Sequence, residues 1–305
     1  MRALVTGGAG FIGSNLAKRL AADGHATVVA DDFSSASWHN LITYGGDVVT
    51  CDVSAGQDGS RLAPLGPFDV IFHQASITDT TVMDQRKMMH NNVEGFRTIL
   101  ELAERWGSRV VWASSAATYG RGPAPMKESQ PPAPLNVYGY SKLAMERLAA
   151  QHAPKLKHPI VGLRYFNVYG AGENHKGKFA SMIGQLARQM RAGKRPRIFY
   201  DGEQKRDFVY IDDVVAANLA AANSKTSGVF NVGSGEAASF NAIIEALNRL
   251  LKTDLPPEYI DNPYDFFQTW TEADLTQSRR VLKYEPKYDL PKGMESYHAS
   301  GQLGA

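Results

Sequence analysis

"MRALVTGGAGFIGSNLAKRL" (residues 1–20) joins a short apolar run to a glycine-rich turn, and then to apolar residues that recur with a helical period. The glycines of the turn, residues 7–13, are spaced G-x-x-G-x-x-G. Strand, glycine turn and helix in this order are typical of a dinucleotide site, because glycines let the backbone approach a pyrophosphate at the helix N-terminus. Asp31 ends the next apolar run, where a carboxylate can accept hydrogen bonds from the adenosine ribose.

Two neighbouring acidic residues give the expected dinucleotide site a preference for NAD over NADP. The negative charges of Asp31 and Asp32 would repel the 2′-phosphate of NADP, and residues 33–40 supply no arginine or lysine to offset them. We therefore expect NAD rather than NADP. Asp52, at the end of the third expected strand, is either an adenine contact or a solvated loop acid.

The rest of the first half alternates apolar strands with amphipathic helices. We expect strands at 3–6, 26–32, 47–53, 68–76, 109–115 and 159–170, with helices after residue 13 and at 91–107 and 138–152. This pattern predicts an α/β fold with a doubly wound, Rossmann-like parallel sheet covered by helices on both faces. We expect a dinucleotide-binding domain over 1–165, rejoined by segments near 207–235, and a smaller mixed α/β substrate-binding domain over 166–305.

Composition narrows the class of protein. The net charge of +2 gives no reason to expect nucleic acid or a membrane as a partner, and no apolar run approaches the length of a membrane span. The first residues enter a strand without a signal-like apolar region, which favours the cytoplasm. Cys51 is the only cysteine, and the eight histidines show no ligand spacing, so we expect no disulfide within the chain and no metal site.

A second motif carries the chemistry. Tyr138 and Lys142 are four residues apart and share one face of the expected helix, whereas Tyr140 has Ala144 at that spacing. A nearby ammonium would lower the pKa of a phenol from its usual value of about 10, and the same lysine could hold the nicotinamide ribose. Ser115 ends a strand, where it could bind the substrate oxygen. A Tyr-x-x-x-Lys pair alone fits an ordinary surface helix, but the pair, the serine and the glycine turn together indicate a catalytic site.

These features resemble the extended short-chain dehydrogenase/reductase family across nearly the whole chain. Within that family the chain is similar to nucleotide-sugar epimerases, and most of all to ADP-L-glycero-D-manno-heptose 6-epimerases. The further segments that carry the resemblance are SSAATYG (114–120), PLNVYGYSK (134–142), RYFNVYG (164–170), ENHKG (173–177), KRDFVY (205–210) and FQTWTEADLT (267–276). The HKG and ADLT parts are the more specific to the 6-epimerases, because the others also occur in UDP-sugar 4-epimerases.

The resemblance and the motifs together give three sets of candidate residues. The catalytic candidates are Ser115, Tyr138, Lys142 and Lys176. The dinucleotide candidates are Gly7, Gly10, Phe11, Ile12, Gly13, Asp31, Asp32, Asp52, Val53, Gln74, Ala75, Ser76, Asn91, Lys142 and Val168. The candidates for a nucleotide-diphosphate sugar are Ser115, Asn167, Lys176, Lys178, Gln185, Phe199, Tyr200, Asp201, Gly202, Arg206 and Phe267. The resemblance also implies a homo-oligomer.

The expected reaction oxidises a sugar carbon to a ketone and returns the hydride to its other face. By resemblance, Tyr138 serves one binding pose of a 6-epimerase and Lys176 serves the other. Lys176 could do so only if burial or a positive neighbour lowered its pKa. In the alternative reading Lys176 binds the diphosphate, as His175 and Lys178 beside it also could, and the chain is a UDP-sugar 4-epimerase. A catalytically silent dinucleotide sensor is disfavoured, because Tyr138 and Lys142 are both present.

Two departures from the 6-epimerase pattern stand out. Phe267 replaces a tyrosine that these enzymes usually show, which removes a hydroxyl donor from the expected sugar site. A lysine that helps to bind the NADP phosphate in some members has no counterpart near Trp38, which fits NAD.

Overall fold

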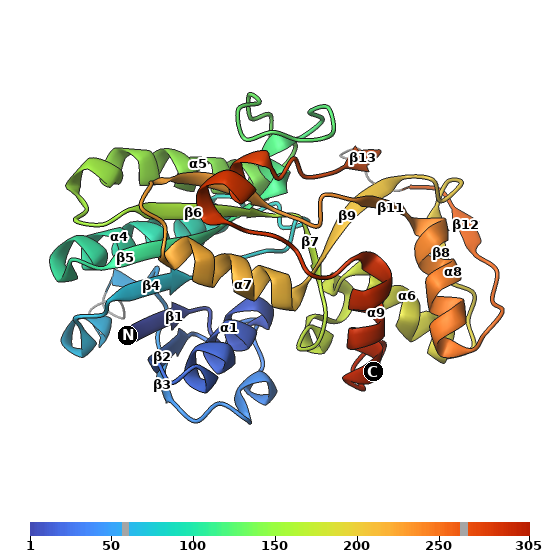
Figure 1. Cartoon of the computed structure of the whole chain (residues 1–305), viewed down its shortest axis with the longest axis horizontal. Helices are drawn as coiled ribbons and strands as arrows, with labels where there is room; N and C mark the ends of the chain where they lie inside the picture. The colour runs from blue at the N-terminus through green and yellow to red at the C-terminus, as the bar shows by residue number, and fades with distance from the viewer. Residues whose placement is uncertain (57–60, 263–267) are drawn as a thin grey trace.

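A seven-stranded sheet forms the centre of the larger half of the protein (Figure 1). The computed structural model describes residues 1–56, 61–262 and 268–305. In spatial order the strands are β10 (Gly228–Val232), β6 (Ile160–Tyr165), β5 (Arg109–Ser115), β4 (Val70–His73), β1 (Arg2–Thr6), β2 (Ala26–Asp31) and β3 (Asp47–Thr50). Every neighbouring pair is parallel. The predicted α/β fold with a doubly wound sheet is confirmed.

Helices cover both faces of this sheet (Figure 1). They are α1 (Phe11–Ala22) with α7 (Ile211–Ala222) in one layer, and α4 (Gly95–Trp106) with α5 (Val137–His152) in the other. Side chains alternate along a strand, so each strand supplies both cores. In β1, for example, Ala3 and Val5 belong to the core that includes α1, whereas Leu4 belongs to the core that includes α4.

The strand order reverses at β1, since β2 follows it on one side and β4 lies on the other. The carboxyl ends of β1 and β4 are held together, because Thr6 Oγ1 lies 2.8 Å from His73 Nδ1. In open α/β sheets the crevice outside the strand ends at such a reversal is the usual ligand site. The fold therefore places the glycine turn, which follows β1, at this crevice.

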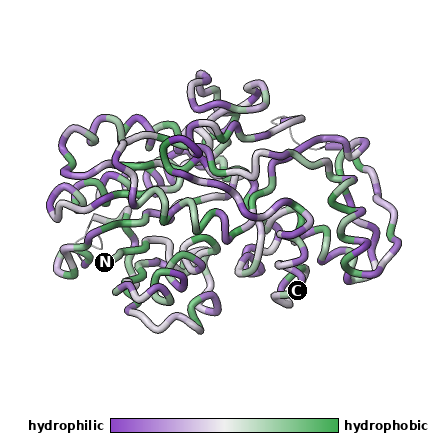
Figure 2. Tube along the Cα trace, in the orientation of Figure 1, coloured by the Kyte–Doolittle hydropathy of each residue, from purple (hydrophilic) through white to green (hydrophobic). Residues whose placement is uncertain are grey.

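The smaller half is built on two short sheets. One contains β7 (Asn167–Tyr169), β9 (Lys205–Tyr210), β11 (Ala237–Ser239) and β13 (Trp270–Thr271), and the other pairs β8 (Arg197–Phe199) with β12 (Glu258–Ile260). The helices of this half are α6 (Met182–Arg191), α8 (Phe240–Leu251) and α9 (Leu290–Ala299). Figure 2 shows hydrophobic and hydrophilic residues alternating along α8, as expected of a helix with one face in a core.

Several elements differ from the expectation. The strand expected over 159–170 is two strands, because the chain leaves the large sheet at Phe166 and continues as β7 in the smaller one. The helix expected over 91–107 consists of a π turn (His90–Glu94) followed by α4, and α3 (Gln85–Met89) precedes the π turn. The strands expected to reach residues 53 and 76 end at Thr50 and His73. Among the described residues, the strands β8, β11, β12 and β13 and the helices α8 and α9 were not expected.

The domain boundaries stay a prediction. Of the segment 207–235, α7 and β10 belong to the large sheet and its covering layers, whereas β9 belongs to the smaller sheet. Across the described ranges no helix is both long and apolar enough to cross a membrane. Those same ranges contain no group of three His, Cys, Asp or Glu side chains arranged to hold a metal ion.

Candidate active site

The glycine turn forms a tight backbone cradle in which side chains at two positions would collide with neighbouring backbone. Gly7 has a φ of 66°, and a Cβ on it would lie 2.5 Å from the backbone nitrogen of Ala75. A Cβ on Gly13 would collide with the carbonyl oxygen of Gly7. Gly10 is the N-cap of α1 and offers no side chain to the first N–H groups of the helix. These N–H groups and the close backbone approach fit the pyrophosphate of a dinucleotide.

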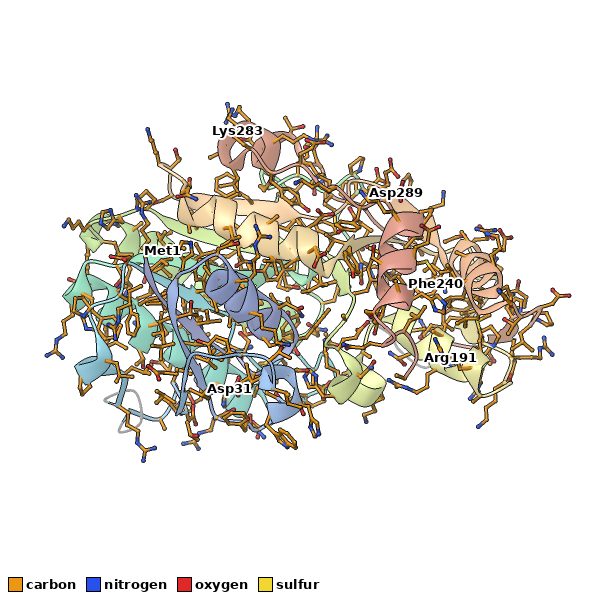
Figure 3. All side chains as sticks on the ribbon, turned by 60° about the horizontal axis from the view of Figure 1, so that its bottom comes forward. Met1, Asp31, Arg191, Phe240, Lys283 and Asp289 are labelled. Carbon is orange, nitrogen blue, oxygen red and sulfur yellow. The ribbon has the colours of Figure 1, made fainter. Side chains whose placement is uncertain are left out.

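Asp31 lies at the carboxyl end of β2, next to this cradle (Figure 3). Its Oδ2 accepts the backbone N–H of Ala9 at 2.9 Å, and its Oδ1 accepts that of Phe33 at 2.8 Å. Burial raises the pKa of Asp31, and backbone hydrogen bonds from Phe33, Ala9 and Gly10 oppose that rise. A carboxylate has about four acceptor positions, so capacity remains for a ribose hydroxyl. Asp32 is exposed and accepts the N–H and hydroxyl of Ser34, so it reaches the site only through its charge.

The other dinucleotide candidates lie along the same edge. Gln74, Ala75 and Ser76 follow β4, and the backbone N–H of Gln74 donates to the Thr6 carbonyl at 3.0 Å. Asp52, which follows β3, accepts the N–H and hydroxyl of Ser54 at 2.8 and 2.7 Å.

Three more candidates complete that set. Val53 is buried in the core that includes α4. Ile12 lies in the first turn of α1. Val168 lies in β7 opposite Val209.

Asn92 is a residue that the sequence did not single out. It is fully buried, its Oδ1 accepts the N–H of Ile77 at 2.8 Å, and its Nδ2 donates to the Ser141 hydroxyl at 2.9 Å. It thereby ties the segment after β4 to α5. The prediction named its neighbour Asn91, which is only partly buried. A π turn adds a residue to a helix and rotates what precedes it, so helical periodicity could not show which asparagine faces inward.

Ser115, Tyr138 and Lys142 come together as the sequence predicted. Ser115 ends β5, and Tyr138 and Lys142 lie in the first turns of α5. Tyr138 is hydrogen-bonded to Ser115, and Lys142 Nζ lies 5.9 Å from the centre of the Tyr138 ring. Asn136 caps the helix by accepting the N–H of Gly139 at 2.8 Å. The structure thus supports the helix-face argument, since Tyr140 is 48% exposed.

The electrostatics of this group differ from the expectation. Lys142 is buried, and its Nζ donates to the Ser76 hydroxyl at 2.6 Å and to the Ala113 carbonyl at 2.8 Å. Burial lowers the pKa of Lys142 to about 7. Burial raises the pKa of Tyr138, and its hydrogen bond with Ser115 only opposes that rise. The sequence had predicted a lowered pKa for the phenol. With its pKa raised by burial, the phenol of Tyr138 favours its protonated form.

Lys176 reaches the same crevice from the other half. It lies in a short 3₁₀ segment, Asn174–Phe179, and its Nζ lies 5.8 Å from the centre of the Phe11 ring at the start of α1. Burial lowers the pKa of Lys176, and the carboxylate of Glu173 opposes that change. Lys178, two residues on, is exposed and lies over the ring of Phe179 instead. Only the first lysine of the motif therefore stands beside the glycine turn.

The remaining substrate candidates lie in the smaller half. Asn167 Nδ2 donates to the Asp207 carbonyl at 3.1 Å, and Gln185 Nε2 donates to the Ala180 carbonyl at 2.7 Å. Burial lowers the pKa of Arg206 to about 10.

The loop after β8 contains the last of them. Tyr200 is 54% exposed with a φ of 53°, and Asp201 Oδ1 accepts the N–H of Glu203 at 3.1 Å. Phe199 ends β8, and Gly202 follows in the same turn. Phe267 lies outside the described residues.

Comparison with known proteins places this geometry in context. The model of the NAD dependent epimerase/dehydratase family matches residues 3–233. The chain is similar to the crystal structure of ADP-L-glycero-D-manno-heptose-6-epimerase from Helicobacter pylori, with 41% identity, a TM-score of 0.93, and coverage of 98% of this chain and 95% of that one. It is also similar to UDP-glucose 4-epimerase from Thermotoga maritima with UDP-glucose, at 29% identity and a TM-score of 0.93 over 99% of each chain. A UDP-glucuronic acid 4-epimerase from Bacillus cereus, in complex with UDP-glucuronic acid and NAD, matches at 28% identity and a TM-score of 0.87 over 98% of each chain.

Proposed function

Because the chain belongs to the NAD dependent epimerase/dehydratase family and is an NAD-dependent nucleotide-sugar epimerase, we propose that it inverts carbon 6 of an ADP-glycero-manno-heptose. The main support is Lys176, a second candidate for proton transfer that comes from a different element than Tyr138 and stands over Phe11. The higher identity to the heptose epimerase than to the 4-epimerases favours the same substrate.

The residues present fit the dinucleotide. Gly10 leaves the first N–H groups of α1 without a side-chain cap, which suits a pyrophosphate, and Asp31 retains acceptor capacity for an adenosine ribose hydroxyl. Lys142 is already hydrogen-bonded to Ser76, and its Nζ lies beside the ring of Tyr138. When bound, NAD supplies a hydride acceptor that later becomes the hydride donor. Everything else in the reaction is proton transfer and positioning by the protein.

Tyr138 and Ser115 are proposed to serve one binding pose of the sugar. Oxidation removes a hydride from carbon 6 and a proton from its hydroxyl, and reduction returns both to the ketone from the opposite face. The protonated phenol of Tyr138 can give its proton to the ketone oxygen, with Ser115 holding that oxygen in place. In the reverse direction the phenolate takes the proton back, helped by the ammonium form of Lys142 nearby.

Lys176 is proposed to serve the other pose. At neutral pH a lysine with its usual pKa of about 10.4 is almost wholly protonated and cannot act as a base. Burial lowers the pKa of Lys176, which favours the neutral amine, whereas the carboxylate of Glu173 favours the ammonium form. A group with both forms accessible can accept a proton in one direction and donate it in the other.

The alternative is a UDP-sugar 4-epimerase with one acid/base. In that case Tyr138 serves both directions, and Lys176 binds the substrate diphosphate as a positive charge. The prediction that the chain is a homo-oligomer is independent of this choice, and sedimentation equilibrium tests it. Incubation with ADP-heptose and UDP-galactose in turn, followed by NMR, reports directly on the sugar and the nucleotide.

The Lys176→Met variant separates the two readings. We expect it to slow turnover in one pose by roughly 10²–10⁴ while ketone reduction in the Tyr138 pose is spared. The matched control is Lys178→Met, which removes an exposed lysine of the same segment. This variant should not slow one binding pose more than the other. The measurement is steady-state kinetics with each epimer, plus reduction of the ketone by the enzyme-bound cofactor. A rise in KM alone for Lys176→Met, equal for both epimers, would favour the 4-epimerase reading.

A further inference from the structure

Two asparagines of the nucleotide-binding half contact the segment that carries Lys176. The first is Asn15, which lies in α1 and is partly buried. Its Nδ2 donates to the Phe11 carbonyl at 2.9 Å and to the Ala171 carbonyl at 3.0 Å. One amide group therefore joins the start of α1 to the chain just before Lys176.

The second asparagine repeats this arrangement. Asn40 lies in the 3₁₀ turn Trp38–Leu41, and its Nδ2 donates to the Ala9 carbonyl of the glycine turn at 3.0 Å. The same nitrogen lies 3.1 Å from His175 Nδ1. That ring nitrogen is also 3.0 Å from the Gly172 carbonyl, so it accepts from Asn40 when unprotonated and donates to Gly172 when it carries a proton. Asn40 thus connects the glycine turn to the residue next to Lys176.

The far side of the segment is fixed by the smaller half. Glu173 is fully buried and accepts the backbone N–H and hydroxyl of Ser181 at 2.5 and 2.7 Å. Gln302 accepts the Gly172 N–H at 2.8 Å through Oε1 and the Asn174 amide at 3.0 Å through its carbonyl. With its base held in this way, the segment is joined to the nucleotide-binding half by side-chain hydrogen bonds from Asn15 and Asn40.

We propose that Asn15 and Asn40 are positioning residues that clamp the Lys176 segment onto the glycine turn. The clamp sets where the amine stands relative to the ring of Phe11, and so relative to the cofactor and sugar that bind there. The inference rests on the proposed catalytic role of Lys176. Its physical basis is that proton transfer needs donor and acceptor within hydrogen-bond reach, and a displacement of about 1 Å can cost roughly a hundredfold in rate.

The test uses Asn15→Ala, Asn40→Ala and the double variant. The matched control is Asn223→Ala, because Asn223 also donates an amide hydrogen bond to a backbone carbonyl, that of Leu219 at 3.0 Å, but lies at the end of α7. We expect each clamp variant to lower kcat in the Lys176-dependent pose, and the double variant to lower it by roughly tenfold to a hundredfold. The Tyr138-dependent pose should change little, and the control should match the wild type.

A second readout needs no turnover. Lysines are dimethylated with ¹³C-formaldehyde, and the pKa of Lys176 is followed by NMR in protein without added substrate, with Lys176→Met used to assign its signal. Release of the segment should expose the amine, so in the double variant the pKa of Lys176 should rise towards its usual value of about 10.4. An unchanged pKa would overturn the clamp.

The clamp variants are also combined with Lys176→Met. If the asparagines act through Lys176, adding the clamp substitutions to Lys176→Met should not lower kcat in the Lys176-dependent pose any further. A full additional loss means a general structural role and overturns the proposal. Failure of the proposed function is tested separately with Lys176→Met alone. It is indicated if that variant affects the kinetics of both epimers equally. The clamp is then judged by the pKa readout, where a rise supports it and no change rejects it.

Discussion

Replacing Tyr138 by phenylalanine, with Tyr140→Phe as its control, tests the catalytic group most directly. Both changes remove one hydroxyl from tyrosines two residues apart on the same helix. Tyr138 is hydrogen-bonded to Ser115 and has Lys142 Nζ 5.9 Å from its ring, whereas Tyr140 is 48% exposed. Any general effect of weakening α5 should therefore appear in both variants, and loss of proton transfer only in Tyr138→Phe.

The expected magnitudes differ widely. Loss of one acid/base group costs roughly 10²–10⁴ in rate, which corresponds to about 3–5 kcal/mol at 1.36 kcal/mol per decade. An exposed substitution is usually within about 0.5 kcal/mol, so Tyr140→Phe should stay within roughly a factor of two. Tyr138→Phe should keep its cofactor, because the glycine cradle and Asp31 are untouched.

The assay follows interconversion of the two epimers by NMR, and the dinucleotide content is measured after denaturing each purified variant. Near-ultraviolet circular dichroism checks that packing is intact. Equal losses for Tyr138→Phe and Tyr140→Phe would refute the helix-face argument. Absence of dinucleotide from the wild type, with no gain of activity on adding NAD, would refute the cofactor assignment.

Two further predictions concern buried charges. Burial lowers the pKa of Lys142 from 10.5 to about 7. Between these two pH values the unfolded chain binds more protons than the folded protein, so the free energy of unfolding should rise with pH, by at most about 1.4 kcal/mol per pH unit. Urea unfolding across that range should show this slope in the wild type and lose it in Lys142→Met. Glu146 accepts two hydrogen bonds from Arg164, at 2.8 and 2.7 Å, and the side chains of Glu146 and Arg164 are 9% and 6% exposed. Glu146→Gln should therefore lower the free energy of unfolding, measured in urea, by about 3–5 kcal/mol. In Glu94→Gln, which breaks an exposed pair with Arg97, the loss should stay below about 1 kcal/mol, and comparable losses in both variants would contradict the burial argument.

Local sequence signals predicted the parts of the site that depend on spacing within one element. The glycine turn needs Gly7 and Gly13 because side chains there would collide with backbone atoms. The G-x-x-G-x-x-G spacing in the sequence indicates this requirement. The pairing of Tyr138 with Lys142 follows from helical geometry alone. Both were predictable because the residues that carry each signal lie within one short segment of the sequence.

Other features depend on contacts between distant segments and left no local signal. The pKa of Tyr138 is set by burial beneath neighbouring elements, so the charge on Lys142 alone gave the wrong direction. The inward-facing role of Asn92 depends on a π turn that a regular helical period cannot reveal. The end of β6 was missed because residues 159–170 are apolar and β-rich throughout, and only the pairing of Val168 with Val209 shows that the chain has changed sheets.

That change of sheets explains how the two proposed proton-transfer groups can approach the same edge of the large sheet from different halves of the protein. Up to β6 the chain builds the large sheet, which supplies Ser115 and, through α5, Tyr138. After Phe166 it enters the smaller half with β7, and Lys176 follows β7 by only seven residues, before α7 and β10 return to the large sheet. The crossing at Phe166 therefore sets the two groups on separate halves of the protein. A one-base epimerase needs only the first half to be rigid. A two-base reaction also needs the second half to be fixed against the first, and the hydrogen bonds from Asn15 and Asn40 to the segment before and beside Lys176 supply that constraint.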